Sequence, residues 1–104
     1  MILALDISTS ITGYSVVSRD GKIETSGFVD LRKKKSFVEK VSHAKNEIIM
    51  NCVGYDIEAV AVEKNLQAFR RGFSSAATID ALARMNGAVS YACASFYDVP
   101  LKNI

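Results

Sequence analysis

The feature that most constrains the fold of this chain is one short run, EAVAVEK at residues 58–64, which lies between two long helical patterns. Its small and β-branched residues predict a buried strand that ends on charge. A strand that is connected through helices on both sides pairs in parallel with its neighbours in the sheet. The chain is therefore expected to contain a partly parallel sheet, which excludes all-helical and purely antiparallel architectures.

Three more strands are predicted before the first helix, at residues 2–7, 12–19 and 22–30. The dipeptide Asp20-Gly21 predicts a two-residue hairpin turn between the second and third of them, so all three form an antiparallel meander. The simplest sheet that also accommodates the parallel strand has the order 3-2-1-4-5.

The first helix is predicted to begin at Ser36, because Ser36 and Glu39 have the spacing of a capping box. Gly54 is expected to end this helix. Apolar residues recur between them at spacings of three and four, which is typical of a helix with one buried face. This apolar stripe consists of Phe37, Val41, Ala44, Ile48 and Cys52.

The second helix is predicted to start near Ser74 or Ser75 and to run to about Phe96. It contains many alanines and one glycine, Gly87, so we expect it to pack closely on the sheet. Residues 99–104 read as the beginning of a fifth strand. The predicted order is β-β-β-α-β-α-β, an α/β fold in a single domain that spans residues 1–104.

Composition limits the function classes that this chain can serve. A hydrophobic fraction of 49% argues against disorder, and a net charge of +2 means that any nucleic-acid binding must rest on local patches. The two cysteines, Cys52 and Cys93, lie in apolar helical patterns without a CxxC motif, so we expect reduced core residues in a cytoplasmic protein. The apolar N-terminal run is too short to span a membrane and lacks the pattern of a secretory leader.

Two carboxylates are predicted to meet at one edge of the sheet. Asp6 lies near the carboxyl end of the first strand, and Glu63 lies at the carboxyl end of the fourth. Parallel strands that are neighbours place these ends side by side, and strand periodicity puts both acids on a face of small side chains. Like charges at this separation repel each other unless a cation lies between them.

Two interpretations of these acids remain open. Asp6 could cap the turn that follows it, and Glu63 could pair with Lys64 or Arg70. Alternatively, both could bind Mg²⁺ or Mn²⁺, which take oxygen ligands and, as a pair of ions, can drive phosphodiester hydrolysis. We prefer the cation site because both acids lie on adjacent strand ends beside a basic loop.

At these residues the sequence resembles the RuvC-type Holliday-junction resolvases, which have a ribonuclease-H-like fold. LALDISTSITGYSVV resembles the opening strand-turn-strand of that family, and VAVEKNLQAF resembles its fourth strand, which ends in a catalytic Glu. LARMNGAV is similar to the helix that follows, where small residues and a glycine pack on the sheet. The resemblance covers essentially the whole chain in order and spacing.

The resemblance implies a metal-dependent endonuclease that resolves branched DNA as a homodimer, in a bacterial or phage-infected cytoplasm. Asp6 and Glu63 would be the catalytic metal ligands. In the loop behind them, Lys64, Arg70 and Arg71 would contact phosphates, and Phe69, or alternatively Leu66, would wedge against bases. The alternatives are a solvated turn for the two arginines and packing on its own helix for Phe69.

Two other segments could contact DNA. Residues 31–35 form the densest basic cluster, in which Lys33 and Lys34 could bind phosphates, although a solvated connector is the interpretation that we prefer. After the first acid, Ser8, Thr9 and Ser10 stand where the family usually has glycine. Their hydroxyls could hydrogen-bond phosphate or simply close the turn.

The chain also departs from the family at its end. The resolvases carry a further helix with one or two acidic residues that complete the metal site, whereas this sequence stops at Ile104. We therefore expect an incomplete domain, either a fragment or a shortened relative, with little or no cleavage activity of its own. Asp80 lies four residues before Arg84 on a predicted helix, which favours an ordinary surface ion pair.

Three functions remain in competition. The first is a structure-selective DNA endonuclease or part of one, and the second is a non-catalytic DNA-binding or dimerisation module on the same fold. The third is a fragment of a phosphotransferase of the actin and sugar-kinase group, whose phosphate-binding hairpin DISTS also resembles. Three features weigh against the third: the Glu that ends the fourth strand, the basic aromatic loop behind it, and the lack of a glycine-rich adenosine motif.

Overall fold

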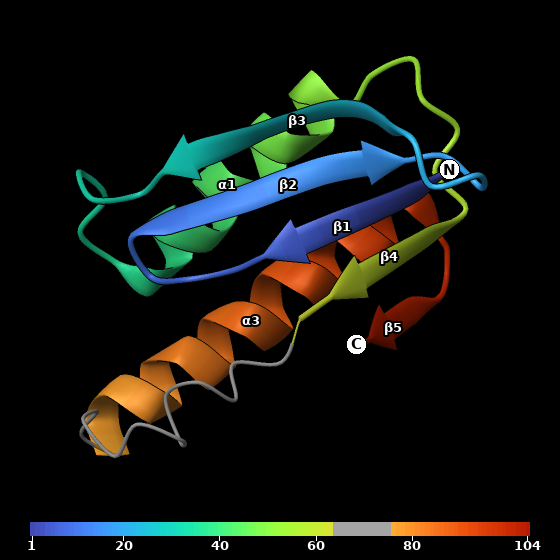
Figure 1. Ribbon diagram of the computed structural model, residues 1–104. Helices are drawn as coiled ribbons and strands as arrows, with labels where there is room; N and C mark the ends of the chain where they lie inside the picture. The colour runs from blue at the N-terminus through green and yellow to red at the C-terminus, as the bar shows by residue number, and fades with distance from the viewer. Residues whose placement is uncertain (64–75) are drawn as a thin grey trace.

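A computed structural model describes residues 1–63 and 76–104 and contains a five-stranded sheet with two helices. In chain order these elements are β1 (Ile2–Asp6), β2 (Ile11–Val17), β3 (Ile23–Asp30), α1 (Phe37–Asn51), β4 (Ala59–Val62), α3 (Ala76–Tyr97) and β5 (Leu101–Asn103). Within the described residues, both helices lie on the same face of the sheet and the opposite face is open (Figure 1).

The sheet has the order β3-β2-β1-β4-β5, which confirms the α/β fold with strand order 3-2-1-4-5. β1 pairs antiparallel with β2 and parallel with β4, and β4 pairs parallel with β5. The central position of β1 follows from the chain connectivity, because a hairpin places β2 on one side and a helical crossover places β4 on the other. The strands are shorter than predicted, since residues 58–64 yield only Ala59–Val62 and residues 99–104 yield only Leu101–Asn103.

The turn between β2 and β3 differs from the predicted two-residue hairpin. The backbone NH of Gly21 donates to the Ser18 carbonyl at 3.0 Å, and the Ser18 NH donates to the Lys22 carbonyl at 2.8 Å. Three residues therefore form the loop, and Gly21 adopts a φ of +86°, which favours glycine. The Asp-Gly signal identified the turn correctly but not its length, because a glycine at positive φ also suits the three-residue loop.

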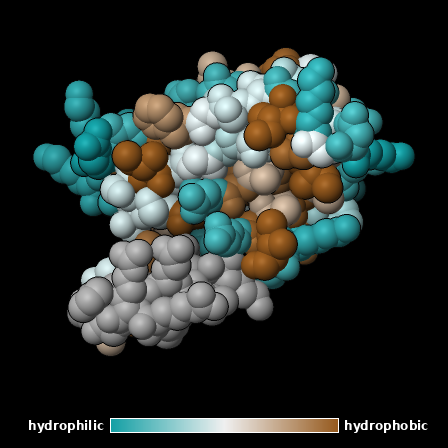
Figure 2. All heavy atoms as spheres, in the orientation of Figure 1, coloured by the Kyte–Doolittle hydropathy of each residue, from teal (hydrophilic) through white to brown (hydrophobic). Residues whose placement is uncertain are grey.

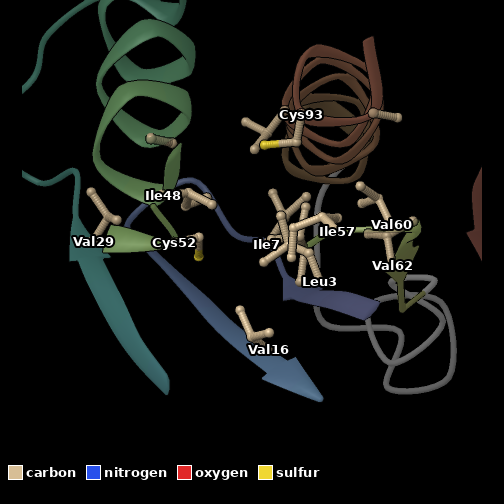
Figure 3. Packing of buried hydrophobic residues seen from close by; sticks show 14 of the residues in the cluster. Leu3, Ile7, Val16, Val29, Ile48, Cys52, Ile57, Val60, Val62 and Cys93 are labelled. Atoms are coloured by element: carbon tan, nitrogen blue, oxygen red, sulfur yellow. The ribbon is translucent and has the colours of Figure 1, made fainter. Parts of the chain in front are cut away.

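The hydrophobic core lies between the sheet and the two helices (Figure 3). β1 contributes Leu3 and Leu5, which alternate with the outward-facing Ala4 and Asp6. The largest fully buried side chains of this layer are Leu3, Ile7, Leu31, Ile48, Met85, Val16, Val60, Val62 and Val89. Burial of each such side chain stabilises the fold by roughly 1.5–3 kcal/mol, so the core fixes the orientation of β1 and β4 firmly.

Helix α1 begins as the sequence predicts. The Ser36 hydroxyl accepts a hydrogen bond from the Glu39 backbone NH at 3.1 Å, which is the Ser half of the capping box. At the other end, Gly54 adopts a φ of +92° two residues after the cap residue Cys52. The apolar stripe is buried along most of its length, but its first member, Phe37, remains 47% exposed.

Helix α3 starts at Ala76, so the predicted start at Ser74 or Ser75 lies outside the described residues. The expectation that Gly87 allows close packing on the sheet is wrong, because Gly87 is exposed and nothing lies within 4 Å of where its Cβ would be. The buried side of α3 instead consists of Met85, Val89, Ser90, Cys93 and Ala94. No helix in the described part of the chain is long and apolar enough to cross a membrane.

Candidate functional site

Asp6 and Glu63 lie side by side at one rim of the sheet. The parallel register pairs Leu5 with Val62, so the next residue of each strand, Asp6 and Glu63, occupies the same level. Neighbouring strands are about 4.8 Å apart. The Glu63 backbone NH also donates to the Leu5 carbonyl at 3.4 Å, which continues the pairing beyond the end of β4. Both side chains are exposed and belong to the open face of the sheet.

Neither carboxylate has a protein partner in residues 1–63 and 76–104, where no hydrogen bond or ion pair involves the Asp6 or the Glu63 side chain. Asp6 therefore does not cap the turn that follows it, because the Ser8 hydroxyl closes that turn instead. For Glu63, the alternative was an ion pair with Lys64 or Arg70, and both of these residues lie outside the described part of the chain. Two adjacent carboxylates that have no counter-charge among the described residues favour a cation between them.

Ser8 closes the turn that follows Asp6. Its hydroxyl accepts a hydrogen bond from the Ile11 backbone NH at 3.0 Å and donates to the Ile11 carbonyl. The Ser8 and Ser10 hydroxyls lie 3.4 Å apart. Of the two roles considered for these hydroxyls, the structure shows turn closure for Ser8, since its oxygen is occupied within the loop.

Contacts from two other segments hold the same turn in place. The Lys40 ammonium on α1 donates to the Thr9 carbonyl at 2.8 Å. The Leu31 backbone NH, at the end of β3, donates to the Ser10 carbonyl at 2.7 Å. The turn that carries the chain away from Asp6 is thus fixed from both sides. The sequence did not single out Lys40, because only the fold reveals that the first turn of α1 lies beside this loop.

Asn86 supports the second carboxylate. From the middle of α3, its side-chain amide donates to the Glu63 backbone carbonyl at 3.0 Å. This bond ties the end of β4 to the helix and fixes the position from which the Glu63 side chain projects. Sequence reasoning missed Asn86; the available signal was a lone amide next to Met85 in a helix of mostly small and apolar residues.

The two acids line a shallow hollow of about 310 Å³ on the open face. Gly13, which pairs with Asp6 across β1 and β2, contributes to this hollow because it has no side chain. A Cβ added at Gly13 would lie 3.8 Å from the Asp6 Cβ, so larger side chains would fill the space beside the carboxylate. The outward-facing residues that line the hollow are Ala4, Asp6, Gly13, Ser15 and Glu63, together with Ile104.

The carboxylate oxygens in this hollow are of the type that a hard divalent cation prefers, but among the described residues they come from two acids only. Two exposed carboxylates that share a hollow offer the oxygen ligands that Mg²⁺ and Mn²⁺ prefer. Among the described residues, no group of three or more His, Cys, Asp or Glu side chains gathers at one place. The remaining residues, 64–75, contain none of these four types in their sequence. Asp6 and Glu63 are therefore the two carboxylates that this hollow offers to a cation.

The basic residues of the connector at 31–35 differ in their contacts and exposure. Arg32 forms a bidentate ion pair with Asp30, whose bonds to the Arg32 guanidinium and backbone NH hold the pKa of Asp30 well below its usual range. Lys33 is exposed and Lys34 is half-buried in the same connector, which lies at the same end of the sheet as the turn after Asp6 (Figure 1). The other predicted DNA contacts, at Lys64, Phe69, Arg70 and Arg71, lie outside the described residues.

Comparisons with known proteins give matches at the level of structure. No protein-family model matches the sequence, and no curated protein matches it. The structure of T. thermophilus RuvC in complex with a Holliday junction substrate is similar with a TM-score of 0.77 and 18% identity. Another Thermus thermophilus RuvC structure is similar with a TM-score of 0.71 and 23% sequence identity. Each match covers 99% of this chain and 62% of the RuvC chain.

A third solved structure shares the core of the fold. It is a candidate N-acetylmannosamine kinase from Listeria monocytogenes, with a TM-score of 0.56, 14% identity, and coverage of 98% of this chain and 34% of the kinase chain. The two RuvC structures agree with this chain better over nearly all of its length. The chain therefore has a RuvC-like fold.

Proposed function

We propose that this chain is the carboxylate core of a metal-dependent, structure-selective endonuclease that acts on branched DNA. The observation that carries the proposal is the proximity of Asp6 and Glu63, which lie at the same level on adjacent strand ends. Within residues 1–63 and 76–104 neither side chain has a hydrogen-bond or ion-pair partner. The RuvC-like fold supports this assignment, and one of the RuvC structures is a complex with a Holliday junction substrate. Because the chain spans 62% of the RuvC chains, its substrate and activity are inferred by analogy.

In this proposal the side-chain oxygens of Asp6 and Glu63 hold Mg²⁺ or Mn²⁺. A bound ion would neutralise the charge of a DNA phosphate and support hydrolysis of the phosphodiester. The chain's own residues orient the ligands: the turn closed by Ser8 fixes the strand end at Asp6, and the Asn86 amide fixes the backbone of Glu63. Gly13 keeps the space beside Asp6 open for substrate.

The second candidate is a non-catalytic DNA-binding or dimerisation module, which the small number of carboxylates favours. Two acids alone hold a pair of metal ions weakly, so we expect little or no cleavage by the purified 104-residue chain. In both candidates, Lys33 and Lys34 are secondary candidates for phosphate contact, because a solvated connector is the preferred interpretation of residues 31–35. We also propose DNA contacts from residues 64–75, with Lys64, Arg70 and Arg71 at phosphates and Phe69 at a base.

A homodimer is also part of the proposal. The first half of α3 extends beyond the sheet (Figure 1), and it exposes Ala77 and Ala81, which lie four residues apart on one side of the helix. Small residues allow two helices to approach closely. Sedimentation equilibrium of the chain would show a dimer if this surface associates. Ala81→Glu is expected to shift that equilibrium toward monomer, whereas a monomeric wild type would contradict the dimer without affecting the metal site.

Metal binding provides the direct test of the site. We expect Mn²⁺ titrated into the chain to bind with an affinity that Asp6→Asn and Glu63→Gln both reduce, measured by electron paramagnetic resonance. Glu24→Gln is the matched control, because Glu24 is an exposed carboxylate of β3 that lies away from the site. Equal Mn²⁺ binding by wild type, Asp6→Asn and Glu63→Gln would show that these acids form no cation site.

Four-way junction binding and cleavage separate the candidates. The endonuclease proposal predicts junction binding that increases with Mg²⁺ or Mn²⁺ and depends on Asp6 and Glu63. The non-catalytic module predicts junction binding that neither the ions nor the two substitutions change. Robust metal-dependent cleavage by the 104-residue chain would contradict our expectation of low activity. Binding of ATP in place of DNA would favour the kinase-like alternative, for which the structure offers only a shared core fold.

A further inference from the structure

A row of residues crosses the open face of the sheet at the level of the two carboxylates. Asp6 on β1 pairs with Gly13 on β2, and Gly13 pairs with Phe28 on β3. Directly opposed residues of neighbouring strands share a face, so Phe28 lies on the same face as Asp6. Glu63 continues the row on the other side of Asp6, one position beyond the Leu5–Val62 pair.

Phe28 is exposed although it lies in the middle of a regular strand pairing. Its side chain is 70% exposed, whereas the next residue, Val29, is 4% exposed on the core side. Two strand spacings separate Phe28 from Asp6, a distance of about 10 Å. Gly13 occupies the strand between them and has no side chain, so no side chain of β2 projects directly between the aromatic ring and Asp6.

The surroundings of Phe28 indicate what kind of molecule would cover it. On the same face of β3 its neighbours along the strand are polar, with Ser26 on one side and Asp30 on the other. Ser15 of β2 lies opposite Ser26. Figure 2 shows this face with apolar residues interrupted by polar and pale ones. Ile11 of β2, which lies opposite Asp30, is 39% exposed on the same face and is the apolar neighbour of this ring. An exposed ring bordered by serine hydroxyls, a carboxylate and one aliphatic side chain suits a planar group with a polar edge, such as a nucleobase.

We propose that Phe28 is a stacking platform for an unpaired or unstacked base of branched DNA and thereby a specificity-determining residue. The inference rests on the proposed function, because the phosphate of the same strand segment would lie at Asp6 and Glu63. A neutral aromatic ring attracts the face of any base without competing for the phosphate charge. Bases inside an intact duplex are already stacked, so this contact favours DNA with a branch point over linear duplex.

The test measures DNA binding by fluorescence anisotropy in Mg²⁺, with a fluorescein-labelled four-way junction and a linear duplex of matched arm sequence. We expect Phe28→Ala to weaken junction binding about fivefold or more and to change duplex binding little. Phe28→Trp should retain junction affinity, whereas Phe28→Leu should weaken it as Phe28→Ala does, because leucine is apolar but cannot stack. The salt dependence of binding should remain that of wild type, since Phe28 contacts no phosphate.

Tyr91→Ala is the matched control, because Tyr91 is also 70% exposed but lies on α3, in the helical layer on the other side of the sheet. It should leave junction binding unchanged. Junction affinity within twofold of wild type for Phe28→Ala, or for Phe28→Leu, would overturn the stacking role while the proposed function remains. A change of oligomeric state in Phe28→Ala on sedimentation would identify a second copy of the chain as the occupant and would also overturn it. A wild type that binds no junction would overturn the proposed function itself.

Discussion

Asn86 on α3 donates a hydrogen bond from its side-chain amide to the backbone carbonyl of Glu63 at 3.0 Å. This contact joins a helix to the end of the strand that carries one of the two candidate metal ligands. It explains how a short strand, Ala59–Val62, can hold an exposed acid in a defined position one residue beyond its last paired residue.

Asn86→Ala should therefore weaken metal binding more than it weakens folding. Loss of one hydrogen bond of this kind costs about 0.5–1.5 kcal/mol in the free energy of unfolding. Groups that orient a ligand affect metal affinity by about tenfold. Asn51→Ala is the control, because Asn51 donates a similar bond to the Glu47 carbonyl at 2.8 Å within α1. Equal Mn²⁺ affinities for wild type and Asn86→Ala would contradict a positioning role.

Gly27→Ala should destabilise the protein by about 1–3 kcal/mol, because the new methyl group overpacks its surroundings. A Cβ at Gly27 would lie 2.5 Å from the Tyr14 hydroxyl and 2.8 Å from the Tyr14 Cζ. The rigid ring of Tyr14 is packed against the core and cannot move away freely. Urea denaturation followed by circular dichroism measures the change.

The opposite sign is expected at Gly87, where a Cβ meets nothing within 4 Å. Gly87→Ala should stabilise α3 by about 0.5–1 kcal/mol, because alanine loses less backbone entropy in a helix. Gly27→Ala and Gly87→Ala add the same methyl group. If both changed the free energy of unfolding in the same direction, one of the two positions would not have these surroundings.

Glu58 should contribute to the acid limb of the stability curve. Hydrogen bonds from the Arg19 guanidinium and from the N-terminal ammonium lower the pKa of Glu58 from 4.5 to about 2. The folded state thus favours the ionised form, and the resulting stabilisation is fully present above about pH 4.5 and is lost as the pH falls toward 2. Wild type should melt at a higher temperature than Glu58→Gln at pH 7, and the difference should vanish near pH 2. A constant difference across this range would exclude the ionised carboxylate as its source.

The two cysteine thiols should be unreactive in the folded protein. Burial raises the pKa of the Cys93 thiol to about 12, with a smaller contribution from Cys52, and burial also raises the pKa of Cys52. Both side chains are at most 1% exposed. A thiol reagent such as Ellman's reagent should label both residues at neutral pH only in denaturant. Rapid labelling without denaturant would show that the layer between the sheet and the helices is open.

The sequence determined the element order and the sheet topology of this protein. The alternation of Leu3 and Leu5 with Ala4 and Asp6 gives the first strand one buried and one open face. Helical connections on both sides of β4 require it to pair in parallel, so the adjacency of Asp6 and Glu63 could be predicted from the chain alone. These features depend on local periodicity and on connection rules, both of which are present in the sequence.

Only the tertiary structure decided which contacts support that pair of acids. Ser8 closes the turn that Asp6 could have capped, Lys40 reaches Thr9 across 31 residues of sequence, and Asn86 reaches Glu63 from a later helix. Gly87, whose place in a small-residue helix suggested a packing role, faces outward. Such contacts depend on how far each helix is rotated and displaced over the sheet. Rotation and displacement follow from the interlocking of the whole core, which no local pattern encodes.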